Sequence, residues 1–117
     1  MIELPHPLLD VLGCDCVGHR EIHELNVAGG PLPANDGLLL ERGALLVMQN
    51  SAPGFPNGVL DLVALRHSGR DGVLVRRRTD PTFRTPSTIA RAHDRYLIVN
   101  ADFATNTRPF TLSALAR

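Results

Sequence analysis

Apolar residues in this chain fall in short runs that turn-forming residues separate. The clearest runs are ALLVMQ at 44–49, VLDLVALR at 59–66, GVLVRRR at 72–78 and YLIV at 96–99. Turn formers gather before them, as in GFPNG ahead of Val59 and SGRDG ahead of Val73. No window carries apolar residues at positions i, i+3, i+4 and i+7 over the length of a helix. Because short apolar runs bounded by turns are typical of strands and hairpins, the pattern predicts an all-β chain.

The strand pattern occurs twice. ALLVMQN aligns with RYLIVNA, so that Leu46 matches Leu97 at an offset of 97 − 46 = 51. VLDLVALR aligns with PFTLSALA, so that Leu62 matches Leu112 at an offset of 112 − 62 = 50. A unit of several strands that recurs at this period indicates the blades of a β-propeller.

Counted as blades, the runs predict a partial β-propeller of about two four-stranded antiparallel blades over residues 20–117, with residues 1–19 poorly specified. We expect one complete blade, then three strands of the next, and the outermost strand of a preceding blade at Arg20–Val27. The expected strands are Gly37–Glu41, Ala44–Gln49, Val59–Arg66 and Gly72–Arg78, followed by Ser87–Arg91, Arg95–Asn100 and Phe110–Leu115. Closed propellers have at least four blades. The alternative is therefore a small open β-domain that protects its edges in another way.

The balance of charged residues limits which classes of macromolecule the protein is expected to bind. The 117 residues suffice for one domain with a core, and 12 basic residues balance 12 acidic ones. Binding to nucleic acid or to an anionic membrane surface needs a positive excess or patch, so neither partner is expected. Every basic residue other than histidine is Arg, which we attribute to a bias in coding rather than to function.

The expected cellular location of the protein follows from a search for membrane-spanning and signal segments. No apolar run approaches the roughly 20 residues that cross a bilayer as a helix. The opening MIELPHPLLDVLG lacks the positive start of a signal peptide, and Pro5 and Pro7 interrupt it. The default expectation is a cytoplasmic protein, or an extracellular one if the chain is a truncated form of a secreted relative.

Several segments together resemble a known family. LPANDGLLLERGALLVMQN, NGVLDLVALR and LVRRRTDPTFRTPSTIARAHDRYLIVNADF look like the C-terminal part of six-bladed propellers of the senescence-marker-protein/gluconolactonase-like family. In that family a Pro-Asn-Gly type of turn leads into an inner strand, and a Leu-Tyr-Val second strand follows. Residues 33–37 with 45–47, and then 86–88 with 96–98, are similar to these elements. The resemblance covers roughly Arg20 to Arg117.

The resemblance also implies a metal site. Asn35 and Asp36 enter an inner strand, Asn50 leaves a second strand, and Asn100 and Asp102 are the exit residues one blade later. In such propellers these loops meet at one mouth of the central channel, where carboxylate and Asn oxygens hold a divalent metal, often calcium, that polarises a lactone carbonyl. Asn35 is the ligand carried over by motif position. The alternative is turn chemistry, which favours the same residue types.

Other motifs carry less chemistry. The segment CDCVGHREIH offers Cys14, Cys16, His19 and His23 to zinc, although its spacing is tighter than that of structural zinc sites, and ordinary reduced thiols are the alternative. The run Arg76–Arg78 is expected on a charged outer strand rather than in an anion site. His67 and His93 are expected in turns between strands.

Three functions follow from these patterns. The leading hypothesis is a non-catalytic or vestigial piece of a gluconolactonase-like propeller that acts as a binding scaffold. A second is a lactone or ester hydrolase that depends on calcium or another divalent metal and is completed by further blades. A third is a small β interaction module that pairs through open sheet edges. The expected partner is a small-molecule ligand or a second copy of the chain.

Overall fold

The computed structural model describes residues 2–5, 22–103, 105 and 110–117. Within these ranges the chain is all-β, as predicted, and contains nine strands and no helix. The described part therefore has no helix long and apolar enough to cross a membrane. The strands are β1 (Ile2–Pro5), β2 (Ile22–Ala28), β3 (Asn35–Glu41), β4 (Ala44–Gln49), β5 (Val59–Arg66), β6 (Asp71–Arg78), β7 (Pro86–Ala92), β8 (Arg95–Asn100) and β9 (Leu112–Ala116).

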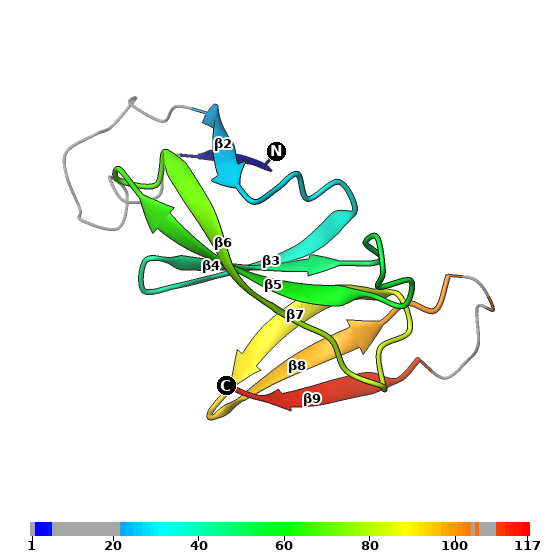
Figure 1. Cartoon of the computed structure of the whole chain (residues 1–117). Coiled ribbons are helices and arrows are strands. Elements are labelled where there is room, and N and C mark those ends of the chain that lie inside the picture. The colour runs from blue at the N-terminus through cyan, green and yellow to red at the C-terminus, as the bar shows by residue number, and fades with distance from the viewer. Residues whose placement is uncertain (1, 6–21, 104, 106–109) are drawn as a thin grey trace.

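The strands form two sheets. The first has the order β1-β2-β6-β5-β4-β3, and its five strands from β2 to β3 curl into half a barrel (Figure 1). Strands β3 to β6 follow one another as an antiparallel meander, as expected for strands joined by short turns. The second sheet has the order β7-β8-β9 and lies beside the first, drawn from yellow to red in Figure 1.

The prediction that Arg20–Val27 belongs to a preceding blade is wrong. β2 pairs in parallel with β6, and Asn26 lies opposite Asp71, so β2 belongs to the first sheet. Parallel partners are distant along the chain, and turn chemistry does not select them.

The hairpin over residues 33–50 forms as the sequence predicts. Arg42 and Gly43 make its two-residue turn with φ of 31° and 75°, and positive φ at both positions is typical of type I′ hairpin turns. Asn35 consequently pairs with Gln49, which brings both polar ends of the hairpin together. His93 lies in the equivalent turn between β7 and β8, which confirms its predicted location.

The repeat is visible in the backbone. β7 and β8 begin 51 residues after β3 and β4 (86 − 35 and 95 − 44), and both hairpins carry a register shift beside their first residue. The N–H of Asn50 donates to the carbonyl of Ala34, and the N–H of Ala101 donates to that of Thr85. The same three-stranded unit is therefore built twice, from β3-β4-β5 and from β7-β8-β9.

The third strands match at a different offset from the predicted one. Asp61 lies opposite Val47 in the first unit, and Ser113 lies opposite Ile98 in the second. Their separation is 113 − 61 = 52 residues, not 50. The error arose because Leu and Ala recur along both strands, so that letter matching accepts a wrong register.

The two units stack through an apolar core. We call inner face the side of each unit that bears Val47 or its equivalent Ile98, and outer face the opposite side. The inner face of the second unit packs on the outer face of the first, in a cluster of Leu46, Met48, Leu60, Phe83, Ile89, Tyr96, Ile98 and Leu115 with Leu39 and Leu62. The inner face of the first unit lies inside the curled sheet, in a cluster of Leu25, Leu32, Leu45, Val47 and Val63 with Val27, Leu65 and Leu74.

Gly37 sets how closely the two sheets approach. A Cβ atom at this position would lie 2.6 Å from the carbonyl oxygen of Ser87 and 2.8 Å from the Cα of Thr88. Only glycine lets β3 and β7 come this near. The turn itself lies at Pro33-Ala34, and Asn35-Asp36-Gly37 already belongs to β3. The Gly of this motif is thus needed for packing between the sheets.

Candidate functional site

Three of the predicted metal ligands lie at the open end of the β3–β4 hairpin. Asn50 Nδ2 donates to Asp36 Oδ2 at 3.4 Å and to the carbonyl oxygen of Pro86 at 2.5 Å. Asn35 Nδ2 donates to the carbonyl oxygen of Leu32 at 2.6 Å. The amide groups of both asparagines therefore support loops at this end of the hairpin.

The other two predicted ligands lie at the equivalent end of the second unit. Asn100 is 1% exposed, and its Oδ1 accepts from the backbone N–H of Arg84 at 2.9 Å. Its Nδ2 donates to Ser113 Oγ at 3.0 Å, and weaker contacts reach Thr82 and Thr111. Asp102 follows β8 with a positive φ of 51° and donates its N–H to the carbonyl of Arg84. Asn100 thus joins strand and loop within its own unit.

No acidic cluster completes a metal site in the described residues. There, no three His, Cys, Asp or Glu side chains gather where they would hold a metal ion. Asp36 and Asn50 bring one carboxylate and one amide together, whereas calcium takes six to eight oxygen ligands. The predicted role of the five residues stays a prediction. The zinc hypothesis falls mostly outside the described residues, since Cys14, Cys16 and His19 lie between the described ranges 2–5 and 22–103, and only the backbone of His23 is described.

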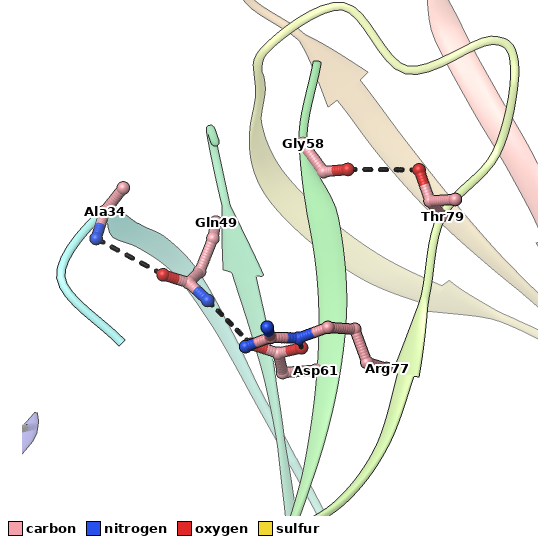
Figure 2. Close-up of polar contacts among 6 residues, drawn as sticks. All are labelled: Ala34, Gln49, Gly58, Asp61, Arg77 and Thr79. Carbon is pink, nitrogen blue, oxygen red and sulfur yellow. Dashed lines mark hydrogen bonds and ion pairs between the residues drawn. The ribbon is translucent and has the colours of Figure 1, made fainter. Parts of the chain in front are cut away.

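A buried polar cluster that the sequence analysis missed lies across β4, β5 and β6. Asp61 is fully buried, and Arg77 binds it with Nε to Oδ1 at 2.7 Å and Nη2 to Oδ2 at 3.0 Å (Figure 2). Gln49 Nε2 donates to Asp61 Oδ2 at 2.7 Å, and Gln49 Oε1 accepts from the N–H of Ala34 at 3.3 Å. The guanidinium of Arg77 also lies 5.8 Å from the ring centre of Phe55.

The electrostatics of this cluster follow from its burial. The hydrogen bonds to Asp61 raise the pKa of Arg77 against the opposing effect of burial. A buried carboxylate is tolerated when a cation and further donors satisfy its oxygens. Asp61 has these partners. The cluster therefore links β4, β5 and β6 to the loop at Ala34. The run Arg76–Arg78 was predicted to form a charged outer strand. One of its members, Arg77, instead pairs with the buried Asp61.

The second unit contains a neutral counterpart of this cluster. Asn100 occupies the position of Gln49, and Ser113 occupies that of Asp61, by the register of the two units. Thr82 Oγ1 lies 2.6 Å from Ser113 Oγ, where Arg77 contacts Asp61 in the first unit. Two sequence signals pointed to this arrangement: Gln49 matches Asn100 in the repeat, and Asp61 interrupts an apolar strand.

A second polar cluster joins the two sheets. Tyr96 Oη donates to Glu41 Oε2 at 2.8 Å, while Arg91 and Arg117 lie 3.4 and 3.8 Å from Glu41 Oε1. Burial, and then the bond to Glu41, raise the pKa of Tyr96, against a smaller lowering effect of Arg117. Glu41 Oε1 is buried and has no hydrogen-bond partner within the described residues, so these ion pairs are its compensation.

The outer face of the second sheet is apolar, exposed at Ala90, Leu112 and Ala114 and half-buried at Leu97 and Val99. It consists of Ala90, Leu97, Val99, Leu112 and Ala114, with Thr88 at one end and Arg95 at the other. Leu112 is 62% exposed, a large value for a leucine in a sheet. The equivalent face of the first unit is core, so we treat this outer face as the candidate binding surface.

The edge of β9 next to this face pairs with no further strand in the described structure, although the carbonyl of Ala116 at its end accepts from Arg78 Nη1 at 2.9 Å. Thr111 and Arg117 form backbone hydrogen bonds toward β8, through the Thr111 carbonyl and the Arg117 N–H. Because bonding alternates along an antiparallel strand, the N–H and C=O groups of Leu112 and Ala114 point away from β8. In the first unit the equivalent edge of β5 pairs with β6.

Comparison with known proteins gives no match, since no family model, no curated protein and no solved structure is significantly similar to the chain. The resemblance to gluconolactonase-like propellers therefore stays a prediction. The interpretation of the outer face of β7-β8-β9 therefore depends on the structure of this chain alone.

The buried ion pair makes a testable prediction. We expect Arg77→Met to lower the free energy of unfolding by about 2 kcal/mol, less than the roughly 3–5 kcal/mol for a fully buried pair, because the Arg77 side chain is 30% exposed. Arg76→Met, on the exposed neighbour, is the matched control and should stay within about 0.5 kcal/mol. Urea unfolding followed by circular dichroism measures both. Equal losses from the two variants would contradict the structural role of the pair.

Titration of Tyr96 gives a second prediction. The chain has one Tyr and no Trp, so ultraviolet absorbance of tyrosinate reports Tyr96 alone. Its midpoint should lie above the ordinary value of about 10, and Glu41→Gln should lower it, whereas Glu24→Gln should not. Since the folded pKa is raised, the stabilisation is present below the unfolded pKa and is lost as pH rises through the folded one. A native midpoint at or below the ordinary value would refute the contact.

Proposed function

We propose that the chain is a non-catalytic binding scaffold, built like part of a gluconolactonase-like propeller, which binds through the outer face of β7-β8-β9. The observation that carries this proposal is the exposure of Leu112 on that face. Leu112 is 62% exposed, while its equivalent in the first unit, Leu60, is 2% exposed. A surface that one unit buries and the other presents to solvent is the expected mark of a binding surface.

The arrangement of the polar residues supports a scaffold rather than a catalyst. Gln49, Asp61 and Asn100 are buried and bonded to strands and loops of their own units. Such groups stabilise the ends of the strands, because buried polar atoms need partners. His67, in the turn after β5, and Asp71, the first residue of β6, form a solvent-exposed pair at 2.8 Å, as expected for a contact that fixes a hairpin.

The propeller architecture is part of the proposal and has one structural argument in its favour. The two units stack inner face on outer face, which is how successive units of a repeat protein bury a continuous core. Strands β3 to β6 also form a four-stranded antiparallel meander of the predicted composition. The parallel pairing of β2 with β6 departs from an isolated blade.

The scaffold proposal predicts where apolar molecules bind. An anilinonaphthalene-sulfonate dye, added to dilute monomeric protein, should fluoresce less with Leu112→Ser than with the unchanged chain. Val75→Ser is the control, because Val75 is 52% exposed but lies on β6, away from the outer face. An equal decrease in both variants, or no decrease with Leu112→Ser, would count against the proposed surface.

The rival function as a metal-dependent lactone hydrolase has a separate test. Asn35 and Asn50 donate their amides to carbonyl oxygens, so we expect calcium to leave the melting temperature unchanged, in the unchanged chain and in Asn35→Ala alike. Hydrolysis of gluconolactone should equal the spontaneous rate with and without calcium. A melting temperature that rises with calcium, and no longer does so in Asn35→Ala, would replace the scaffold with the metal-dependent enzyme.

A further inference from the structure

We propose that a cavity between the two sheets, beside β6, binds a small organic carboxylate whose apolar group contacts leucine side chains and whose carboxylate is held by Arg76 and Arg78. The cavity lies on the side of β8 that bears Tyr96, opposite to the outer face of β7-β8-β9. The carboxylate site is therefore separate from the proposed binding surface, and it goes beyond the scaffold function.

A bulge in β6 determines where its arginines point. The ladder between β5 and β6 shifts register at Val75, which has no partner on β5. Leu74, just before the bulge, packs inside the curled sheet, and strict alternation would send Arg76 and Arg78 to the same side. The bulge reverses the alternation, so that Arg77 turns inward to Asp61 and its two neighbours turn toward the second sheet. Bulges are frequent next to functional sites because they re-aim side chains in this way.

The cavity has an apolar floor and a cationic rim. Leu46, Leu60 and Leu62 form the floor, while Arg76 is exposed and Arg78 is half-buried at the rim. The cavity volume is about 130 Å³. This is well above the roughly 10–15 Å³ that admits one water, and below the roughly 300–1,000 Å³ of pockets for drug-sized ligands. The space therefore suits a ligand of few heavy atoms and excludes a nucleotide.

The positive charge at the rim has no anionic partner in the described part of the chain. There, the guanidinium of Arg76 forms no hydrogen bond and no ion pair. Arg78 Nη1 donates to the carbonyl oxygen of Ala116 at 2.9 Å, which leaves its other N–H groups for a ligand. Arg117 also lines the cavity, but its Nη2 lies 3.8 Å from Glu41 Oε1. Arg76 and Arg78 are thus the two cations that an anion in the cavity would pair with.

The two parts of the cavity together select the class of ligand. Arg76 and Arg78 are two residues apart on one face of β6, roughly 7 Å along the strand, so one carboxylate fits between their guanidinium groups. The planar guanidinium matches a carboxylate with paired hydrogen bonds. An inorganic anion would leave the leucine floor without an apolar partner, and a neutral molecule would leave both cations unpaired. A small carboxylate with a compact apolar group satisfies both.

Tyrosine fluorescence tests the proposal on the full chain. Tyr96 lines the cavity and is the one Tyr in a chain without Trp, so its emission reports this site. At constant ionic strength, 3-methylbutanoate should change the emission with saturation. The dissociation constants of the neutral 3-methylbutanamide and of inorganic phosphate should be at least tenfold higher. Equal binding of the amide would overturn the role of the arginines, and equal binding of phosphate would overturn the role of the leucine floor.

A pair of variants tests the location of the site. Arg76→Gln should raise the dissociation constant of 3-methylbutanoate at least tenfold. Arg66→Gln is the matched control, because it removes the same charge from an exposed residue at the other end of the β5–β6 hairpin, and it should leave binding unchanged. Circular dichroism checks that both variants are folded. Equal weakening by both variants would assign the effect to net charge and overturn the site. So would a titration without saturable fluorescence change and without heat in calorimetry, whereas the dye test of Leu112→Ser would be unaffected.

Discussion

The structure depends on the burial of β4 from both sides. Leu45 and Val47 face the interior of the curled sheet, and Leu46 and Met48 face the second sheet, each at most 4% exposed. Full burial of side chains of this size contributes roughly 1.5–3 kcal/mol each before the entropy of ordering is counted. Because a three-stranded sheet has two faces and cannot cover either alone, stacking of units is the condition for a core. Gly37 makes that stacking close.

Two-sided burial of apolar strands leaves their polar ends to be satisfied locally. Gln49 and Asn100 stand at the same position of the two units, and each accepts a hydrogen bond from the loop that enters its own unit. The first unit adds the charged pair of Asp61 and Arg77, and the second uses hydroxyl groups instead. The same backbone arrangement thus accommodates either a charged pair or a pair of neutral hydroxyl groups at this position. In both units the buried polar atoms form hydrogen bonds with nearby groups.

Local patterns therefore predicted most of the fold. Strand positions followed from short apolar runs and from the turn residues between them, and so did the hairpin that turns at Arg42-Gly43. The parallel pairing of β2 and the offset of 52 residues at Ser113 were missed, because both depend on packing between distant segments. The bond between Asp61 and Arg77 was missed for the same reason: it spans 16 residues, and a run of three arginines looks solvent-exposed from composition alone.

The repeat also explains why the candidate surface lies where it does. A stack of like units has an inner face at one end and an outer face at the other. In this chain β2 and the loop after it cover the inner end, where Leu25 and Leu32 fill the curl. The outer end keeps the apolar composition of a core surface, with Leu112 at 62% exposure. Polar residues at these positions would leave the unit soluble without a partner, so the apolar composition itself indicates a face that becomes covered.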